Sequence, residues 1–265
     1  MLFIDRKELD RASAAGLEVN DDADGSKVVK MHGSFWLVCE KDDDAFTPPV
    51  MRTGNWEAWN TVAIMRELGT LPSPTLVDVG ANVGYFAMTA WTEGYDTIAF
   101  EPNPDVVDLL KRSAYMNAEM TDAGLRVVPK GVGDKAGKLF LHDFDGHSGA
   151  NSFVYGPENG VEVEIVTLDD TIDNKVGLYV LKVDVEGFER EVWDGAKELR
   201  AKSHNVWFLE WVPVRHGYDY NKEWLEEVLL THDIQMVNYD GTLRPMGLEE
   251  ALRVDFEMIV FRKRS

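Results

Sequence analysis

The chain has very little cysteine and no long apolar run. Cys39 is the single cysteine among 265 residues, which excludes an intrachain disulfide, and its apolar neighbours predict a small buried residue rather than a nucleophile. No stretch approaches the ~20 apolar residues that a membrane-spanning helix needs. The first ten residues carry charges too early for a signal peptide. These absences predict a cytoplasmic protein that does not enter a membrane.

Basic residues are also scarce. Lysine and arginine total 27 against 47 acidic residues, which gives a formal net charge of -20. A surface this acidic repels phosphate backbones and anionic lipids, so neither long nucleic acid nor a membrane is an expected partner. Hydrophobic residues make up 45% of the chain, which is enough for one sizeable folded core.

Composition and patterning divide the chain into two regions, an N-terminal cap over residues 1–50 and a main domain over residues 51–265. In the cap, acidic turns at 21–25 and 41–44 flank a weakly alternating stretch over 27–40. That pattern predicts a small β-hairpin with solvated acidic loops.

The main domain alternates short apolar runs with helical patterns. Helices are expected at 55–68, from 104 to about 114, at 188–201 and at 221–230, and strands at 76–79, 97–100, 125–128, 178–185 and 205–211. This alternation predicts an α/β fold, a parallel sheet with helices on both faces. Two further strands are expected near the C-terminus, at 234–238 and 257–261, and this pair would add an antiparallel strand to the sheet. A hairpin is expected from 138–142 and 162–166, with a polar loop at 148–152 between its strands.

A glycine turn follows the first of these strands. Gly80 and Gly84 let the backbone turn tightly beside a ligand, and Glu101 ends the next strand, where an acid binds a ribose diol. The third glycine of a dinucleotide fingerprint is missing, and Asp78 lies close to where a pyrophosphate would sit. The ammonium and sulfonium of S-adenosylmethionine suit that acid better than two phosphates do. An NAD-binding oxidoreductase is therefore the weaker alternative.

A second group of charges lies at the ends of two later strands. Side chains alternate along a strand, which puts Lys182, Asp184 and Glu186 on one side. Glu210 lies near the carboxyl end of the next strand, and His216 lies in the loop after it. Ligands of open α/β sheets bind at the carboxyl ends of the strands, so these residues converge with Gly80 and Glu101. Structural alternatives remain: a Lys182–Asp184 ion pair, a buried Glu210 bound to a backbone donor, and a solvated His216.

Ligand-type residues also raise the question of a metal. The three acids Asp184, Glu186 and Glu210 could bind Mg²⁺ and acidify a hydroxyl, and histidines and aspartates gather over residues 142–147. The stretch at 142–147 contains Asp145 and Gly146, which are also typical of an ordinary turn. No metal is predicted from either.

Several of these stretches together resemble the FkbM-type family of S-adenosylmethionine-dependent methyltransferases. The matching pieces are GNWE at 54–57, VDVGANVG at 77–84, FEPNP at 100–104, VGD at 132–134, TLDD at 167–170, LKVDVEGFE at 181–189 and LEW at 209–211. The resemblance covers about residues 50–212. It implies a class I methyltransferase fold, Rossmann-like, with a seven-stranded, mostly parallel sheet and an antiparallel last strand.

The resemblance also implies S-adenosylmethionine as the cofactor and assigns residues to it. Its contacts fall on Asp78, Gly80, Ala81, Asn82, Gly84 and Glu101, with Pro102 and Asn103 beside them. Val132, Gly133 and Asp134 are expected near the adenine, Asp184 near the reacting methyl, and Glu57 over the methionine end.

The function implied is O-methylation of a hydroxyl on a sugar or a secondary-metabolite small molecule. An alcohol must lose its proton to attack the methyl group, so a base beside it accelerates the reaction. Asp184, Glu186, Glu210 and His216 are the candidates, with Lys182 tuning the carboxylates. The cap is expected to cover the acceptor, with Phe35 and Trp36 as contacts. N- or carboxyl-methylation and a catalytically silent S-adenosylmethionine-binding protein remain alternatives, and the acceptor and oligomeric state stay open.

Overall fold

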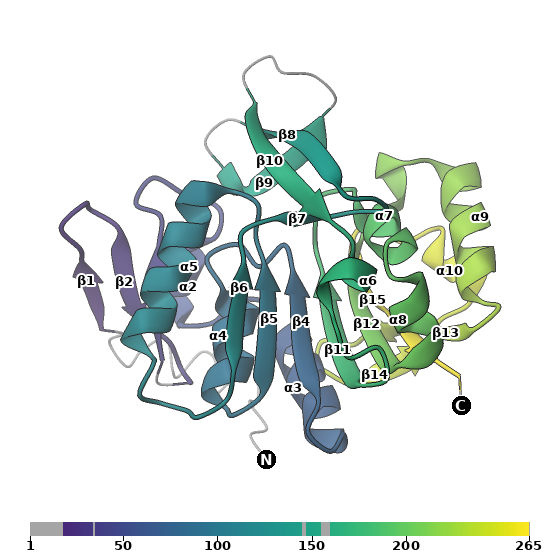
Figure 1. Cartoon of the computed structure of the whole chain (residues 1–265), viewed down its shortest axis with the longest axis horizontal. Coiled ribbons are helices and arrows are strands. Elements are labelled where there is room, and N and C mark those ends of the chain that lie inside the picture. The colour runs from purple at the N-terminus through teal and green to yellow at the C-terminus, as the bar shows by residue number, and fades with distance from the viewer. Residues whose placement is uncertain (1–17, 34, 145–146, 155–159, 265) are drawn as a thin grey trace.

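A mostly parallel sheet forms the centre of the protein (Figure 1). The computed structural model describes residues 18–33, 35–144, 147–154 and 160–264. The strands of the sheet lie in the order β14-β13-β15-β12-β11-β4-β5-β6. Their bounds are β4 (Thr75–Val79), β5 (Asp96–Phe100), β6 (Leu125–Val128), β11 (Leu178–Val183), β12 (His204–Trp211), β13 (His232–Val237), β14 (Leu243–Pro245) and β15 (Glu257–Lys263).

The directions of the strands confirm the predicted sheet. β6, β5, β4, β11 and β12 pair in parallel, and β15 runs antiparallel to both β12 and β13. This is the expected seven-stranded arrangement with one antiparallel strand, and the three-residue β14 extends its edge.

Helices cover both faces because consecutive residues of the strands point in opposite directions. Leu76, Val180 and Phe208 point to one face, where they pack against α3 (Ala58–Thr70), α4 (Tyr85–Thr92) and α5 (Pro104–Met116). Their neighbours Val77, Leu181 and Leu209 point to the other. That face is covered by α6 (Leu168–Thr171), α7 (Glu189–Asp194), α8 (Lys197–Lys202), α9 (Tyr218–Val228) and α10 (Leu248–Ala251).

The N-terminal hairpin is present, and a third strand extends it. β1 (Val19–Asp21), β2 (Lys27–Lys30) and β3 (Trp36–Cys39) form an antiparallel sheet. Ser113 of α5 and Asn117, which caps the end of α5, hold β3. The amide of Val38 donates to Ser113 Oγ at 2.8 Å, and the amide of Trp36 donates to Asn117 Oδ1 at 2.8 Å. The sheet shares one apolar core with α3, α4 and α5, and Cys39 is buried in it as expected.

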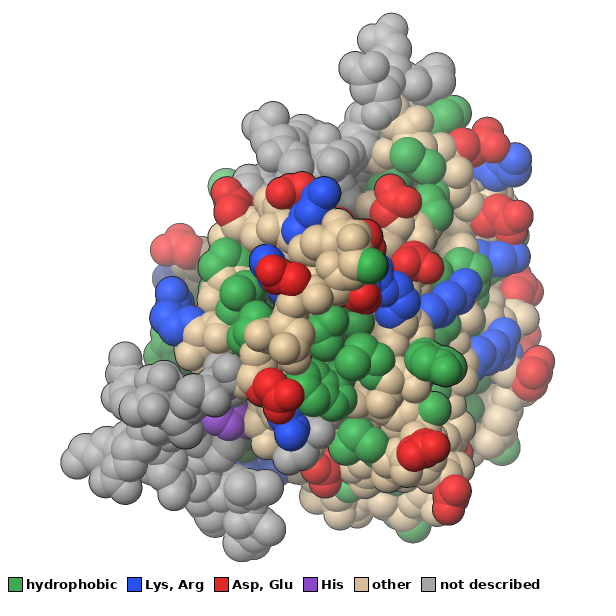
Figure 2. Space-filling view, turned by 90° about the vertical axis from the view of Figure 1, so that its left-hand side faces the viewer, with side chains coloured by type: hydrophobic (Ala, Val, Ile, Leu, Met, Phe, Trp, Pro, Cys, Tyr) green, Lys and Arg blue, Asp and Glu red, His purple; other side chains and the backbone are tan. Residues whose placement is uncertain are grey.

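The outer face of this region carries charges of both signs. Figure 2 shows acidic and basic side chains interspersed there with apolar ones. Arg112 of α5 forms ion pairs with Asp22 and Asp24 next to β1.

A second sheet stands beyond the carboxyl ends of β4 and β5 (Figure 1). It has the order β7-β10-β8-β9, with β7 (Gly131–Val132), β8 (Gly137–Phe144), β9 (His147–Val154) and β10 (Val161–Val166). The expected pairing of the segments at 138–142 and 162–166 is confirmed. The expectation of a polar loop at 148–152 was wrong, because those residues belong to β9 and pair with β8.

Two helical features differ from the sequence expectation. The helix expected at 188–201 is interrupted at Gly195, where a Cβ would lie 2.0 Å from the carbonyl oxygen of Gly133. The backbones of Gly195 and Gly133 touch, and the helix divides into α7 and α8. A short helix, α2 (Thr47–Thr53), also precedes α3 and was not expected. Across the described residues, every helix is too short or too polar to cross a membrane.

Candidate active site

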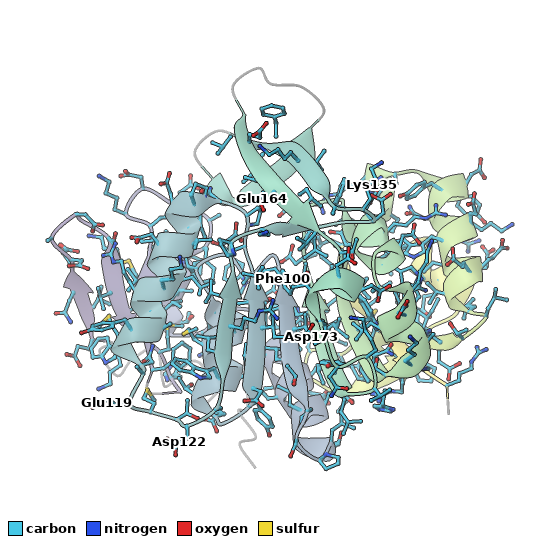
Figure 3. The ribbon with its side chains drawn as sticks, in the orientation of Figure 1. Phe100, Glu119, Asp122, Lys135, Glu164 and Asp173 are labelled. Atoms are coloured by element: carbon cyan, nitrogen blue, oxygen red, sulfur yellow. The ribbon has the colours of Figure 1, made fainter. Side chains whose placement is uncertain are left out.

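A cavity of about 390 Å³ opens at the carboxyl ends of β4, β5, β11 and β12. This volume is in the range of small-molecule sites. Phe100, the last residue of β5, lies at the centre of the fold and contributes to the cavity wall (Figure 3). The predicted site residues on the wall are Glu57, Gly80, Ala81, Asn82, Glu101, Pro102, Val132, Lys182, Asp184, Glu186 and Glu210.

The glycine turn after β4 is held against its neighbouring strands. The amides of Gly80 and Ala81 donate to the carbonyl of Phe100 at 3.0 and 2.9 Å. Gly80 has φ 74°, in the left-handed region that favours glycine. Gly84 has φ 95° and begins α4. Gly80 lines the cavity, but the space of its missing Cβ is taken by the backbone of Asp184, and a Cβ at Gly84 would face Leu110. Both glycines therefore let the turn pack closely against neighbouring parts of the fold.

Glu101 is fixed by two backbone amides. Its Oε2 accepts from Asn82 and its Oε1 from Asn103, both at 2.9 Å. Burial raises the pKa of this carboxyl to about 7, against the effect of the two amides. Each carboxylate oxygen has a second lone pair available, so Glu101 can accept two hydroxyl groups of a ribose. Asn103 also caps α5 by accepting from the amide of Asp105, as its sequence predicted.

Lys182 links two acids from neighbouring strands. Its Nζ lies 3.7 Å from Asp78 and 3.4 Å from Asp184, and it donates to the carbonyl of Gly80 at 3.0 Å. Burial alone would lower the pKa of Lys182, but Asp184, Asp78 and Glu57 outweigh it and raise that pKa. Burial raises the pKa of Asp78 to about 6, although Lys182 opposes the rise. The ion pair considered as a structural alternative is present, and it lies within the cavity wall.

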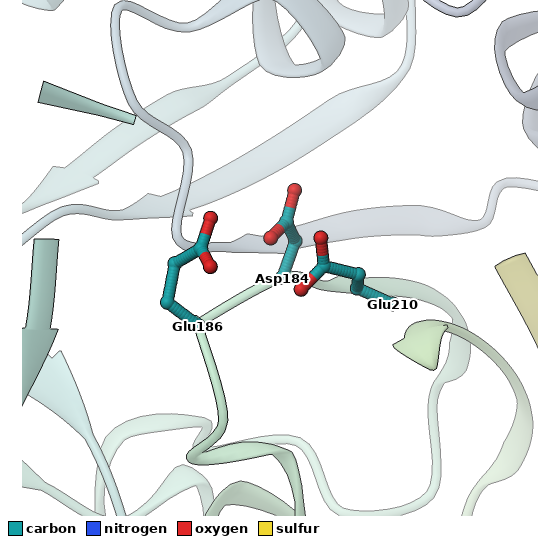
Figure 4. A group of neighbouring side chains, drawn as sticks. All are labelled: Asp184, Glu186 and Glu210. Carbon is teal, nitrogen blue, oxygen red and sulfur yellow. The ribbon is translucent and has the colours of Figure 1, made fainter. Parts of the chain in front are cut away.

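Asp184 of this pair also belongs to a group of three neighbouring carboxylates (Figure 4). One oxygen from each of Asp184, Glu186 and Glu210 lies within 4.8 Å of the others. Burial, and then the charge of Asp184, raises the pKa of Glu186 to about 7. Burial, Asp184 and Glu186 raise the pKa of Glu210 to about 9. The convergence of these acids follows the prediction.

The route by which Glu186 reaches the cluster differs from the prediction. The strand ends at Val183, so strand alternation does not place Glu186. Instead, Glu186 and Gly187 have positive φ values of 54° and 100° and turn the chain back toward the cavity. Glu189 supports the turn, because its Oε1 accepts from the amides of Val185 and Gly187.

Arg215 is a site residue that the sequence analysis missed. Its guanidinium forms ion pairs with both Glu186 and Glu210. It belongs to a 3₁₀ turn, η1 (Pro213–Arg215), that follows β12. Its nearness in sequence to Glu210, close to the end of β12, did not predict a contact with Glu186.

Several predicted residues lie outside the described cavity wall. Gly133 is packed against Ile165 and Phe188. His216 stacks on Tyr220 with ring centroids 4.9 Å apart and lies close to Gly187, and burial lowers its pKa. Asp134 is exposed. The full set outside the wall is Asp78, Gly84, Asn103, Gly133, Asp134 and His216. The side chains of the histidine and aspartate group at 142–147 lie outside the described residues.

Aromatic residues form the apolar wall, but they differ from those predicted. Phe46 and Trp56 lie 4.9 Å apart between ring centroids and line the cavity with Tyr85, Phe86 and Phe256. Phe35 is buried in the N-terminal core and Trp36 lies on β3, so among the described residues neither lines the cavity. The N-terminal region contributes Ala45 and Phe46 instead.

Glu57 completes the wall on the side of α3. It has φ 41° at the start of that helix, and its Oε2 accepts from Asn60 Nδ2 at 2.8 Å. Burial raises the pKa of its carboxyl.

The fold and the site together define a class I S-adenosylmethionine-dependent methyltransferase. The parallel sheet with its antiparallel strand, the glycine turn after β4 and the acid after β5 are the elements of that class. The chain belongs to the FkbM methyltransferase family, since residues 78–233 match the methyltransferase FkbM domain. S-adenosylmethionine is its cofactor.

One methyltransferase sequence and several solved structures are similar to this chain. Methyltransferase sdnD of Sordaria araneosa is 30% identical, in an alignment covering 56% of this chain and 70% of sdnD. Among solved structures, a TehB-like S-adenosylmethionine-dependent methyltransferase of Corynebacterium glutamicum has a TM-score of 0.46 at 12% identity, covering 82% of this chain and 94% of its own. Magnesium protoporphyrin IX methyltransferase of Synechocystis PCC 6803, with bound SAM, has a TM-score of 0.43 at 12% identity, covering 83% and 85%. These structural likenesses are distant, and the family rests on the sequence.

Proposed function

We propose that this methyltransferase transfers the methyl group to a hydroxyl of a small-molecule acceptor, a sugar or a secondary metabolite. The position of Asp184 carries the proposal. Its amide donates to the carbonyl of Val79 at 3.1 Å, and its own carbonyl lies against Gly80. Its carboxylate belongs to the acidic cluster. Asp184 thus joins the cofactor turn to a group of proton acceptors.

The residues around the glycine turn suit the cofactor. Glu101, Gly80 and Val132 line the cavity. Glu101 would accept from the ribose hydroxyls, the turn at Gly80 would hold the methionine portion, and Val132 would border the adenine. Glu57 covers the methionine end from α3. When bound, S-adenosylmethionine supplies a methyl group on a sulfonium, which departs as a neutral thioether.

Asp184 acts on the acceptor. Its carboxylate would take the proton that the acceptor hydroxyl loses on methylation. A positioned carboxylate of this kind contributes about 10²–10⁴-fold to the rate. Lys182 fixes the orientation of Asp184 through its 3.4 Å ion pair.

The charges of the cavity favour a neutral acceptor. Asp184, Glu186 and Glu210 would repel an acceptor that itself carries a carboxylate, which argues against carboxyl-methylation. The aromatic wall of Phe46, Trp56 and Phe256 offers apolar surface to the body of the acceptor. A cytoplasmic location is part of the proposal, supported by the single buried cysteine.

The acceptor class is tested with labelled S-adenosylmethionine and matched sets of acceptors. Each set offers a hydroxyl, an amine or a carboxyl group on one scaffold, and mass spectrometry and NMR locate the added methyl. The proposal expects methyl ethers. Methyl esters or N-methyl products would replace it, and binding of S-adenosylmethionine without any transfer would favour a silent protein.

A further inference from the structure

Arg215 contacts two of the three carboxylates that a metal ion at this cluster would need. The oxygens of Asp184, Glu186 and Glu210 are close enough together to hold a divalent cation, and carboxylates are ligands that Mg²⁺ and Mn²⁺ prefer. One guanidinium nitrogen of Arg215 contacts Glu186 and the other contacts Glu210. Two of the three carboxylates are therefore already joined by one cation.

The third carboxylate has its own cation. Lys182 Nζ lies 3.4 Å from Asp184, so the three acids face two fixed positive charges. These charges are partly shielded from water: the side chains of Lys182 and Glu210 are 4% and 10% exposed, and those of Glu186, Asp184 and Arg215 are 23%, 29% and 30% exposed. Burial and the neighbouring acids raise the pKa of Glu210, and Arg215 opposes that rise. The chain itself thus supplies two cations to this group of acids.

We propose that Arg215 serves as a built-in cation, a positioning residue that holds Glu186 and Glu210 in place and excludes a divalent metal from this cluster. The proposal rests on the proposed function, because it concerns the acceptor side of the same cavity. The planar guanidinium suits this task, since its fork reaches two carboxylates at once. A divalent ion would have to displace both contacts.

The test measures Mn²⁺ binding by electron paramagnetic resonance and needs no acceptor. The variants are Glu210→Gln, Arg215→Gln and the double variant. Any Mn²⁺ that the wild type binds is expected to remain bound in Glu210→Gln, which would show that the cluster holds none of it. Arg215→Gln is expected to gain a site, at least tenfold tighter than any in the wild type, and the double variant is expected to lose it again.

Arg112 provides a matched control. It also bridges two carboxylates, those of Asp22 and Asp24, but on the surface beside β1. Arg112→Gln is expected to produce no site that depends on Glu210.

Two results would overturn the proposal. One is a wild-type Mn²⁺ site that Glu210→Gln removes, and the other is a folded Arg215→Gln variant that gains no site. If Arg215→Gln does not fold, the comparison of the wild type with Glu210→Gln still decides whether the native cluster binds Mn²⁺. Calorimetry with S-adenosylmethionine on the same proteins separates this outcome from a failure of the proposed function, because loss of cofactor binding in the wild type would contradict only the latter.

Discussion

The backbone carbonyl of Asp184 fills the space in which a side chain at Gly80 would lie. A Cβ at Gly80 would be 1.8 Å from that oxygen, far closer than two such atoms can approach. The turn after β4 and the end of β11 are therefore in direct backbone contact. Any side chain at position 80 must push apart the cofactor turn and the residue that we assign to proton transfer.

Gly80→Ala should consequently abolish most cofactor binding and destabilise the protein. Two costs add. The positive φ strains a non-glycine residue by about 1–3 kcal/mol, and the new Cβ clashes with the backbone of Asp184. Gly94→Ala separates them, because Gly94 has φ 94° but nothing within 4 Å of its Cβ position. Urea denaturation and calorimetry should show a small loss of stability and normal binding for Gly94→Ala. Equal effects of the two variants would contradict the contact.

Glu101→Ala should weaken the binding of S-adenosylmethionine by about tenfold to a hundredfold. The change removes the acceptor of the ribose hydroxyls, and hydrogen bonds to a charged group contribute roughly 1.5–3 kcal/mol. Calorimetry with S-adenosylmethionine and NAD in parallel measures the effect, with Glu93→Ala on the exposed end of α4 as the control. Unchanged affinity would show that the end of β5 does not hold the ribose, and tight binding of NAD would contradict the cofactor.

Glu189→Ala should destabilise the turn that carries Glu186. The amides of Val185 and Gly187 both donate to Oε1 of Glu189, whose side chain is buried. A fully buried amide left unpaired costs about 1–3 kcal/mol, and these two amides are part-buried, so each loss should lie toward the lower end. Glu189→Gln is the matched variant, since its single amide oxygen can accept both bonds, and thermal melting should show it close to the wild type. Equal losses in the two variants would point to the charge of Glu189 rather than to these bonds.

Stability should fall as the pH rises from about 5 to about 8, because buried carboxyls keep their protons in the folded state. The pKa of Glu210 is raised to about 9, whereas an unfolded glutamate titrates near pH ~4.3. Between these values the unfolded chain binds fewer protons than the folded one, so the free energy of unfolding decreases with pH.

Glu210→Gln should reduce this decrease by up to about 1.4 kcal/mol per pH unit, as measured by urea denaturation. Glu198→Gln is the control. Its carboxyl is exposed and paired with Lys202, which lowers its pKa, so its contribution changes only below this window. A Glu210→Gln variant with the wild-type slope would show that Glu210 is ionised throughout.

Local patterns predicted which residues lie together at the ends of β4 and β5. Gly80, Glu101 and Asn103 lie within one β-α-β unit, where chain connectivity fixes which residues meet. Asp184 and Glu210 followed from the rule that the ends of parallel strands share one edge.

Contacts between distant segments set the limit of these predictions. The break at Gly195 depends on Gly133, and the burial of Phe35 depends on how β3 packs against α5. Arg215 carries no pattern of its own, because a turn after β12 places its long side chain beside Glu186. No periodicity of a single segment encodes such contacts.

Asp184→Asn tests the account most directly. The amide keeps the shape of the side chain but cannot take the hydroxyl proton, and Lys182 retains Asp78 as a partner. The decisive measurement is the rate of methyl transfer at saturating S-adenosylmethionine for this variant. Asp233→Asn is the control, because Asp233 of β13 has an exposed carboxylate that pairs with Arg264. The account predicts at least a tenfold fall in kcat for Asp184→Asn alone, with unchanged cofactor affinity and thermal midpoint. Full activity of Asp184→Asn would contradict it.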